Sequence, residues 1–145
     1  EFRRVLFRSF PNINTGSGET FDYAWSYCYG LNKFPLLDTG AGQSFTYTWS
    51  FFGGQEFPKL DTSNGTEFYG SWNYCTELKS FPELDFSKGE QFTYAWFNCF
   101  NLKEFPLLDF SSGTNFHETW AYCSGLTSFP TLDLSSGVYF SGTWF

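Results

Sequence analysis

The stretch FPLLDFSSGTNFHETWAYCSGLTS, residues 105–128, is one copy of a unit that recurs along the chain and decides its fold. The dipeptide Phe-Pro stands at positions 10, 34, 57, 81, 105 and 129, and these six pairs account for every proline. The intervals are 24, 23, 24, 24 and 24 residues. A fixed period of this length indicates a repeat protein whose copies bury their apolar faces against one another.

Each copy predicts one short helix and one short strand. Phe116, Thr119, Trp120 and Cys123 fall at i, i+3, i+4 and i+7, which is the spacing of one helical face. The segment 126–132 has apolar residues at spaced positions and indicates a strand, although its proline lacks a backbone donor. We therefore expect an α/β repeat solenoid with one short parallel strand plus one short helix per 23–24-residue repeat.

The repeats are expected to form one domain over residues 10–145. Its copies are 10–33, 34–56, 57–80, 81–104, 105–128 and an incomplete 129–145. Residues 1–9, EFRRVLFRS, hold every arginine of the chain and do not share its aromatic bias. They resemble a translated sequencing adapter, so we treat them as non-native and leave them out of the fold.

The segment GTNFHETWAYCSGLTSFP, residues 113–130, resembles the BspA-like leucine-rich-repeat surface proteins of bacteria, whose units run through a similar core into a strand. The resemblance covers residues 10–145. It implies a cell-surface or extracellular location, and adhesion or binding to a protein or glycan of another cell or matrix. Similar repeats in phage-encoded proteins suggest a second role, as a structural spacer in a fibre.

Composition argues against several classes of function. The formal net charge is −7 and no arginine lies beyond residue 9, which disfavours nucleic acid and anionic membrane surfaces as partners. No apolar run approaches the roughly 18 residues that a membrane span needs. No copy gathers a nucleophile, a base and an orienting group, so we expect neither an enzyme nor a cofactor.

Four cysteines occupy one equivalent position in their copies, and Phe52 takes that position in the second copy. These cysteines are Cys28, Cys75, Cys99 and Cys123. A position that accepts Phe favours a buried, reduced thiol that fills space. Disulfides between neighbouring copies, such as Cys99 with Cys123, are one alternative. A metal site is another, although the cysteines do not have the spacing that is usual for metal ligands.

Acidic residues recur in the motif D-x-S-x-G, and Asn14 replaces Asp in the first copy. They are Asp38, Asp61, Asp85, Asp109 and Asp133. Each is expected either to accept hydrogen bonds from the backbone of its own turn or to contribute to a column of carboxylates that attracts Ca²⁺.

Aromatic residues make up 25% of the chain and divide into two groups. The predicted core columns contain the cysteines together with Trp25, Trp49, Trp72, Trp96, Trp120 and Trp144. The outward group is Tyr23, Tyr27, Tyr47, Phe51, Tyr74, Tyr94 and Tyr122. The outward rings either seal grooves between copies or form a repeated binding surface for proteins or glycans.

Two further surface features are expected. His117, the only histidine, stands in a column that also holds Asp22, Thr46 and Tyr69, so we interpret it as a surface variant. Pairs of polar residues before each Phe-Pro, such as Asn32 with Lys33, mark a second exposed face.

The predicted function is non-catalytic adhesion or ligand binding through an extended face, with a structural spacer as the alternative. Because arrays of repeats need capped ends, end-to-end self-association is also expected.

Overall fold

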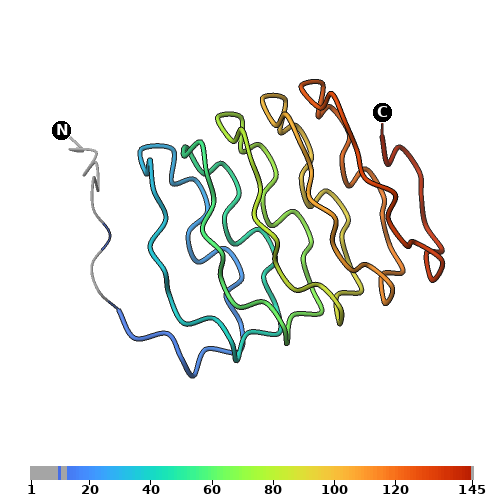
Figure 1. Ribbon diagram of the computed structural model, residues 1–145. Coiled ribbons are helices and arrows are strands. Elements are labelled where there is room, and N and C mark those ends of the chain that lie inside the picture. Colours follow the sequence, from blue (N-terminus) through green and yellow to red (C-terminus); the bar gives the residue numbers. More distant parts are fainter. Residues whose placement is uncertain (1–9, 11–12, 145) are drawn as a thin grey trace.

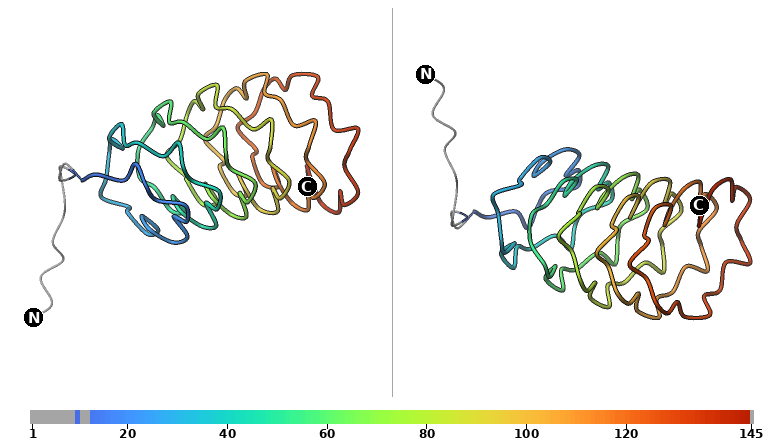
Figure 2. Two further views of the ribbon diagram at one scale, coloured as in Figure 1. Left: turned by 90° about the horizontal axis from the view of Figure 1, so that it is seen from below. Right: turned by 90° about the horizontal axis from the view of Figure 1, so that it is seen from above.

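A computed structural model describes residues 10 and 13–144. The chain winds into a stack of coils, with one coil for each copy of the repeat, and successive coils lie side by side along one axis (Figures 1 and 2). Residues near 20 and residues near 140 lie at opposite ends of this stack. We number the coils 1 to 6 from the copy that begins at Phe10.

The predicted α/β solenoid with a helix in every repeat is wrong, and so is the leucine-rich-repeat architecture that the resemblance implied. The described residues contain no α-helix and no strand longer than an isolated bridge. Residues 117–122, which were predicted to be helical, form consecutive turns instead. The proposed strand at 126–132 is reduced to one bridge, between Ser128 and Glu104.

The backbone conformation of the aromatic segment explains the missing helix. In coil 5, Glu118 and Tyr122 have φ of 49° and 59°, and equivalent residues of the other coils share this left-handed conformation. Such residues interrupt a right-handed helix. The segment instead makes three successive turns, with hydrogen bonds from Thr119, Ala121 and Cys123 N–H to the carbonyl three residues earlier.

Hydrogen bonds between coils replace those of the expected helix. In coil 4 the N–H groups of alternate residues donate to carbonyl oxygens of coil 5: Phe92 to Asn115, Tyr94 to His117, Trp96 to Thr119 and Asn98 to Ala121, at 2.8–3.0 Å. Earlier coils repeat this pattern. The aromatic segment therefore satisfies its backbone through its neighbours, which a helix would not need.

Parallel bridges join the coils along two lines. One line is continuous and links Thr20, Ser44, Glu67, Gln91, Asn115 and Tyr139. The other is broken and, within the described residues, consists of Glu56–Ser80 and Glu104–Ser128. The second line ends at each Phe-Pro, where the proline offers no N–H for a ladder.

The core is a set of stacked aromatic columns. Neighbouring indoles from Trp25 to Trp144 lie 5.1–6.2 Å apart with interplanar angles of 3–15°. Trp49, Trp72 and Trp96 are fully buried, whereas Trp144 is 55% exposed because no further described coil lies against it. The predicted core position thus holds a buried indole in coils 1 to 5 and an exposed one in coil 6.

The second coil is one residue shorter than the others and contains the pair Gly53-Gly54. A Cβ on Gly53 would collide with the carbonyl oxygen of Tyr29 in coil 1. One on Gly54 would lie 2.6 Å from the carbonyl oxygen of Asn32. The glycines therefore permit a close backbone approach between coils 1 and 2 that no larger residue would allow.

Candidate ligand-binding surfaces

Two ladders of aromatic rings run along the outside of the stack, on the turns that follow each Gly. Ladder A consists of Tyr23, Tyr47, Tyr69, Tyr94 and His117, with ring centroids 5.2–5.7 Å apart. Ladder B consists of Tyr27, Phe51, Tyr74, Phe97 and Tyr122, with centroids 4.6–5.5 Å apart. All seven outward aromatics named from the sequence lie in these ladders.

The structure adds residues that sequence reasoning missed. Gly70 occupies the left-handed position of ladder A in coil 3, and the neighbouring Tyr69 supplies the ring. Asn98 occupies that position of ladder B in coil 4, and Phe97 supplies the ring. The sequence did contain a signal for these two rings: where Gly or Asn interrupts an aromatic column, the residue directly before it is aromatic. Each ladder therefore continues through every coil from 1 to 5.

Seven of the ten ladder residues are held in a backbone conformation that favours glycine. Tyr23, Tyr47 and Tyr94 have φ of 51–58°, and Tyr27, Phe51 and Tyr74 have φ of 55–61°. A left-handed residue with a side chain costs about 1–2 kcal/mol relative to the right-handed form. These six residues and Tyr122, with φ of 59°, accept this cost where Gly70 and Gly142 avoid it.

The stacking decides which part of each ring reaches solvent. The interplanar angles are 19° for Tyr23 with Tyr47, and 13° and 11° for Phe51 with Tyr27 and Tyr74. In these three contacts the rings cover one another's faces and present their edges and hydroxyl groups outward. The other five contacts of the ladders are tilted or edge-on, with interplanar angles of 53–79°. Burial raises the pKa of Tyr47, so its phenol remains a neutral donor.

The histidine and the cysteine of coil 5 do not form a joint site. His117 Nε2 lies 3.2 Å from the Tyr94 hydroxyl and 3.4 Å from Glu118 Oε1. Cys123 Sγ instead donates inward to the Trp96 carbonyl oxygen at 3.0 Å. The two side chains thus have separate surroundings.

All four cysteines are free thiols, so the structure contains no disulfide between Cys99 and Cys123. Cys75, Cys99 and Cys123 are buried and Cys28 is half-buried. Cys75 and Cys99 donate to the carbonyl oxygens of Trp49 and Trp72, at 3.3 and 3.1 Å. Burial raises the pKa of Cys99 well above its ordinary value, which disfavours the reactive thiolate.

Small hydroxyl residues beside the core make a second set of bonds between coils. Thr48, Ser71 and Thr119 donate to the carbonyl oxygens of Phe21, Phe45 and Phe92, respectively, at 2.6–2.9 Å. These three side chains are buried. This position of the repeat therefore carries a hydrogen bond to the preceding coil in coils 2, 3 and 5.

The acidic residues close their own turns. Asp61 Oδ1 accepts from both the backbone N–H and the hydroxyl of Ser63, at 3.0 and 2.7 Å. Asp109 and Asp133 accept from the N–H two residues later, at 2.9 and 3.0 Å. These bonds lower the pKa of all three carboxyl groups. The turn-capping interpretation is confirmed at these positions. Among the described residues, no three His, Cys, Asp or Glu side chains gather as a metal site.

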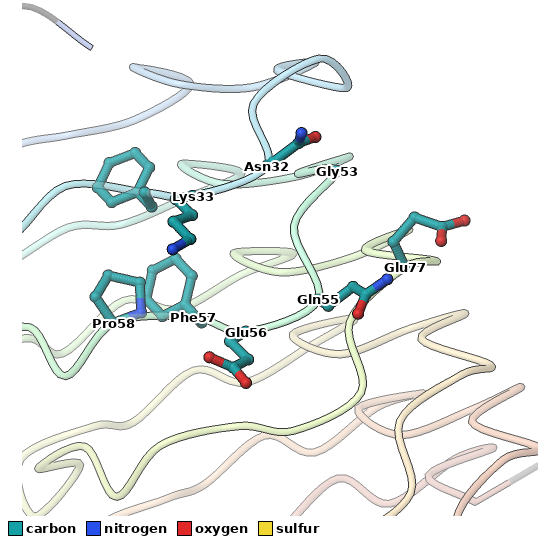
Figure 3. Close-up of a pocket in the computed structure, with 9 residues that line it drawn as sticks. Asn32, Lys33, Gly53, Gln55, Glu56, Phe57, Pro58 and Glu77 are labelled. Atoms are coloured by element: carbon teal, nitrogen blue, oxygen red, sulfur yellow. The ribbon is translucent and has the colours of Figure 1, made fainter. Parts of the chain in front are cut away.

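A cleft of about 830 Å³ opens beside the short second coil (Figure 3). Asn32 and Lys33 enter it from coil 1, and Gln55 and Glu56 enter it from coil 2, with Glu77 at its far side. The apolar lining comes from Phe34, Phe57 and Pro58. The cleft therefore lies at the first two polar pairs that were expected to mark the second exposed face.

No family model matches the sequence, and no curated protein or solved structure matches it either. The described residues contain no helix that is long and apolar enough to cross a membrane. The ladders and the cleft are therefore the features that bear on function.

Proposed function

We propose that the chain is a non-catalytic binding module that engages a protein partner through the face formed by ladders A and B. The observation that carries this proposal is the continuity of both ladders through coils 1 to 5, even where the left-handed residue is Gly or Asn. A cell-surface or extracellular position with a role in adhesion fits such a module.

The exposed chemistry of the ladders favours a protein over a glycan at this face. Tyrosine edges combine an apolar rim with a hydroxyl that donates and accepts, and they suit the mixed chemistry of a protein surface. Stacking on a sugar ring requires an open aromatic face, and the stacked contacts of coils 1 to 3 cover ring faces in both ladders. Tyr23 and Tyr27 are about 60% exposed, so the ladders are most accessible at coil 1.

A structural spacer remains the second candidate, favoured by the unbroken indole column. Five contacts of 5.1–6.2 Å run from Trp25 to Trp144 without a gap. A continuous core of this kind suits an elongated element whose outer rings serve only to seal the coils. Neither role involves a reaction or a cofactor.

The two candidates differ in what happens when the ladders are altered. We would measure binding to a panel of purified extracellular-matrix proteins by surface plasmon resonance. The test variant combines Tyr27→Ser and Tyr74→Ser, and the matched control combines Lys103→Ala and Glu104→Ala on the polar-pair face. Saturable binding that the test variant loses and the control keeps supports the binding module. Absence of saturable binding, or equal binding by both variants, supports the spacer.

A further inference from the structure

The cleft at coils 1 and 2 lies beside the one break in the period of the repeat. The second copy lacks one residue and replaces the usual Leu-containing segment with Gly53-Gly54. These glycines bring its backbone against the Tyr29 and Asn32 carbonyl groups of coil 1. Gln55 and Glu56, which follow these glycines, line the cleft together with Asn32 and Lys33 of coil 1 (Figure 3).

Polar side chains without partners surround this space. None of the five polar side chains makes a hydrogen bond or ion pair with any described residue; they are Asn32, Lys33, Gln55, Glu56 and Glu77. All five are exposed. They provide two amides, two carboxylates and one ammonium group within one cleft, so a ligand would gain hydrogen bonds without first breaking any within the protein.

The lining argues against several classes of ligand. A single lysine beside two carboxylates is a poor site for phosphate, sulfate or a polyanionic chain. Phe34 and Phe57 are only 6% and 5% exposed, which leaves too narrow an apolar strip for a lipid. The volume lies within the roughly 300–1,000 Å³ that is usual for small-molecule sites.

We propose that this cleft binds a neutral oligosaccharide. Neighbouring sugar hydroxyls can donate to the Glu56 and Glu77 carboxylates and to the Gln55 carbonyl. The Asn32 amide and the Lys33 ammonium donate from the opposite wall. The C–H face of a sugar ring rests on Pro58, which is half-buried at the apolar side of the cleft. This site is separate from ladders A and B and extends the proposed function to a second kind of ligand.

The test is to titrate the full chain separately with cellohexaose, maltohexaose and chitohexaose and to monitor the amide chemical shifts by NMR. At least one probe is expected to bind saturably and to shift the amides of Gly53, Gly54 and Lys33. A heparin oligosaccharide serves as the polyanionic probe and is expected not to bind there. If none of the neutral probes shifts these amides, or if heparin competes for them, the proposal is wrong.

Two variants test the walls of the cleft. The pair Gln55→Ala with Glu56→Ala is expected to weaken binding on the order of tenfold, since it removes hydrogen bonds to a charged group. Its matched control is Lys103→Ala with Glu104→Ala, the same pair of positions in coil 4. Insertion of Leu after Gly54 restores the 24-residue period and is expected to abolish binding. Unchanged affinity in the folded Gln55→Ala, Glu56→Ala variant would contradict the proposal.

The outcome is independent of the protein-binding proposal. The variant that combines Tyr27→Ser and Tyr74→Ser is expected to bind the neutral probe as the unaltered chain does. Loss of oligosaccharide binding in that variant would place the sugar on ladder B and would overturn its assignment to the cleft.

Discussion

The indole column and the two outer ladders share the spacing of the coils but lie in opposite surroundings. Trp72 and Trp96 are 5.3 Å apart and fully buried, while Tyr23 and Tyr47 are also 5.3 Å apart, with Tyr23 60% exposed. Coil spacing therefore sets the ring spacing on both sides of the backbone. Ring stacking alone does not show that a column is functional, so exposure and the left-handed backbone must distinguish core from surface.

The largest difference between the columns should appear on truncation of a ring. Trp72→Ala is expected to lower the free energy of unfolding by about 3–5 kcal/mol, because it empties a fully buried position. Tyr74→Ala, two residues later in ladder B, should cost only about 0.5–1.5 kcal/mol in lost ring contacts. Denaturant unfolding monitored by fluorescence measures both. Equal losses would mean that the ladders are part of the core.

A smaller effect is expected from the thiol column. Cys99→Ala removes a buried side chain and its bond to the Trp72 carbonyl oxygen, so we expect a loss of about 1–2 kcal/mol. Cys28→Ala is the matched control, because Cys28 is half-buried, and it should cost less. In the same samples, iodoacetamide should modify Cys28 first and Cys99 last. Faster modification of Cys99 would contradict its buried, protonated state.

Acid should weaken the turns that flank both columns. The pKa values of Asp61, Asp109 and Asp133 are lowered in the folded chain, so these groups stabilise it fully above the unfolded value of about 3.9. That contribution is lost as the pH falls through the folded pKa values. Glu67 affects stability in the opposite direction. Burial and the nearby acidic residues raise its pKa, so protonation at low pH removes an unfavourable negative charge from the folded chain.

Thermal unfolding between about pH 6 and pH 2 measures the net effect of the three aspartates and Glu67 on stability. The midpoint temperature is expected to fall below about pH 4, and the Asp61→Asn variant should show a shallower fall. Asn14 already fills this role in coil 1, where its side chain accepts from the Gly16 N–H at 3.2 Å. A steeper fall in the variant would count against the turn-capping bonds.

The sequence predicted the stacking of copies, the buried Trp positions and the capped turns, but not the local backbone. Phe116, Thr119, Trp120 and Cys123 all lie buried in the structure, although they reach the core from successive turns rather than from a helix. Helical spacing and stacked turns thus produce the same apolar pattern here. Hydrogen bonds to neighbouring coils favour stacked turns over a helix. The sequence of a single copy does not reveal these bonds.

The cleft illustrates a second limit of sequence reasoning. The missing residue of copy 2 was visible, but it was interpreted only as a shorter repeat. The close approach of Gly53 and Gly54 to coil 1 depends on where the Tyr29 and Asn32 carbonyl groups lie. Similarly, the left-handed positions were hidden because seven of the eleven found among the described residues carry aromatic side chains; the others are Gly70, Asn98, Glu118 and Gly142.

The smallest predicted effect, and the most direct test, compares Tyr94→Gly with Tyr94→Ala. Both variants remove the same ring, but Tyr94 has φ of 57°, which Gly adopts freely and Ala does not. If left-handed turns build the outer face, the Gly variant will be more stable than the Ala variant by about 1 kcal/mol in denaturant unfolding. If the segment is helical, Ala will be the more stable by about 1 kcal/mol, and the account of stacked turns will be wrong.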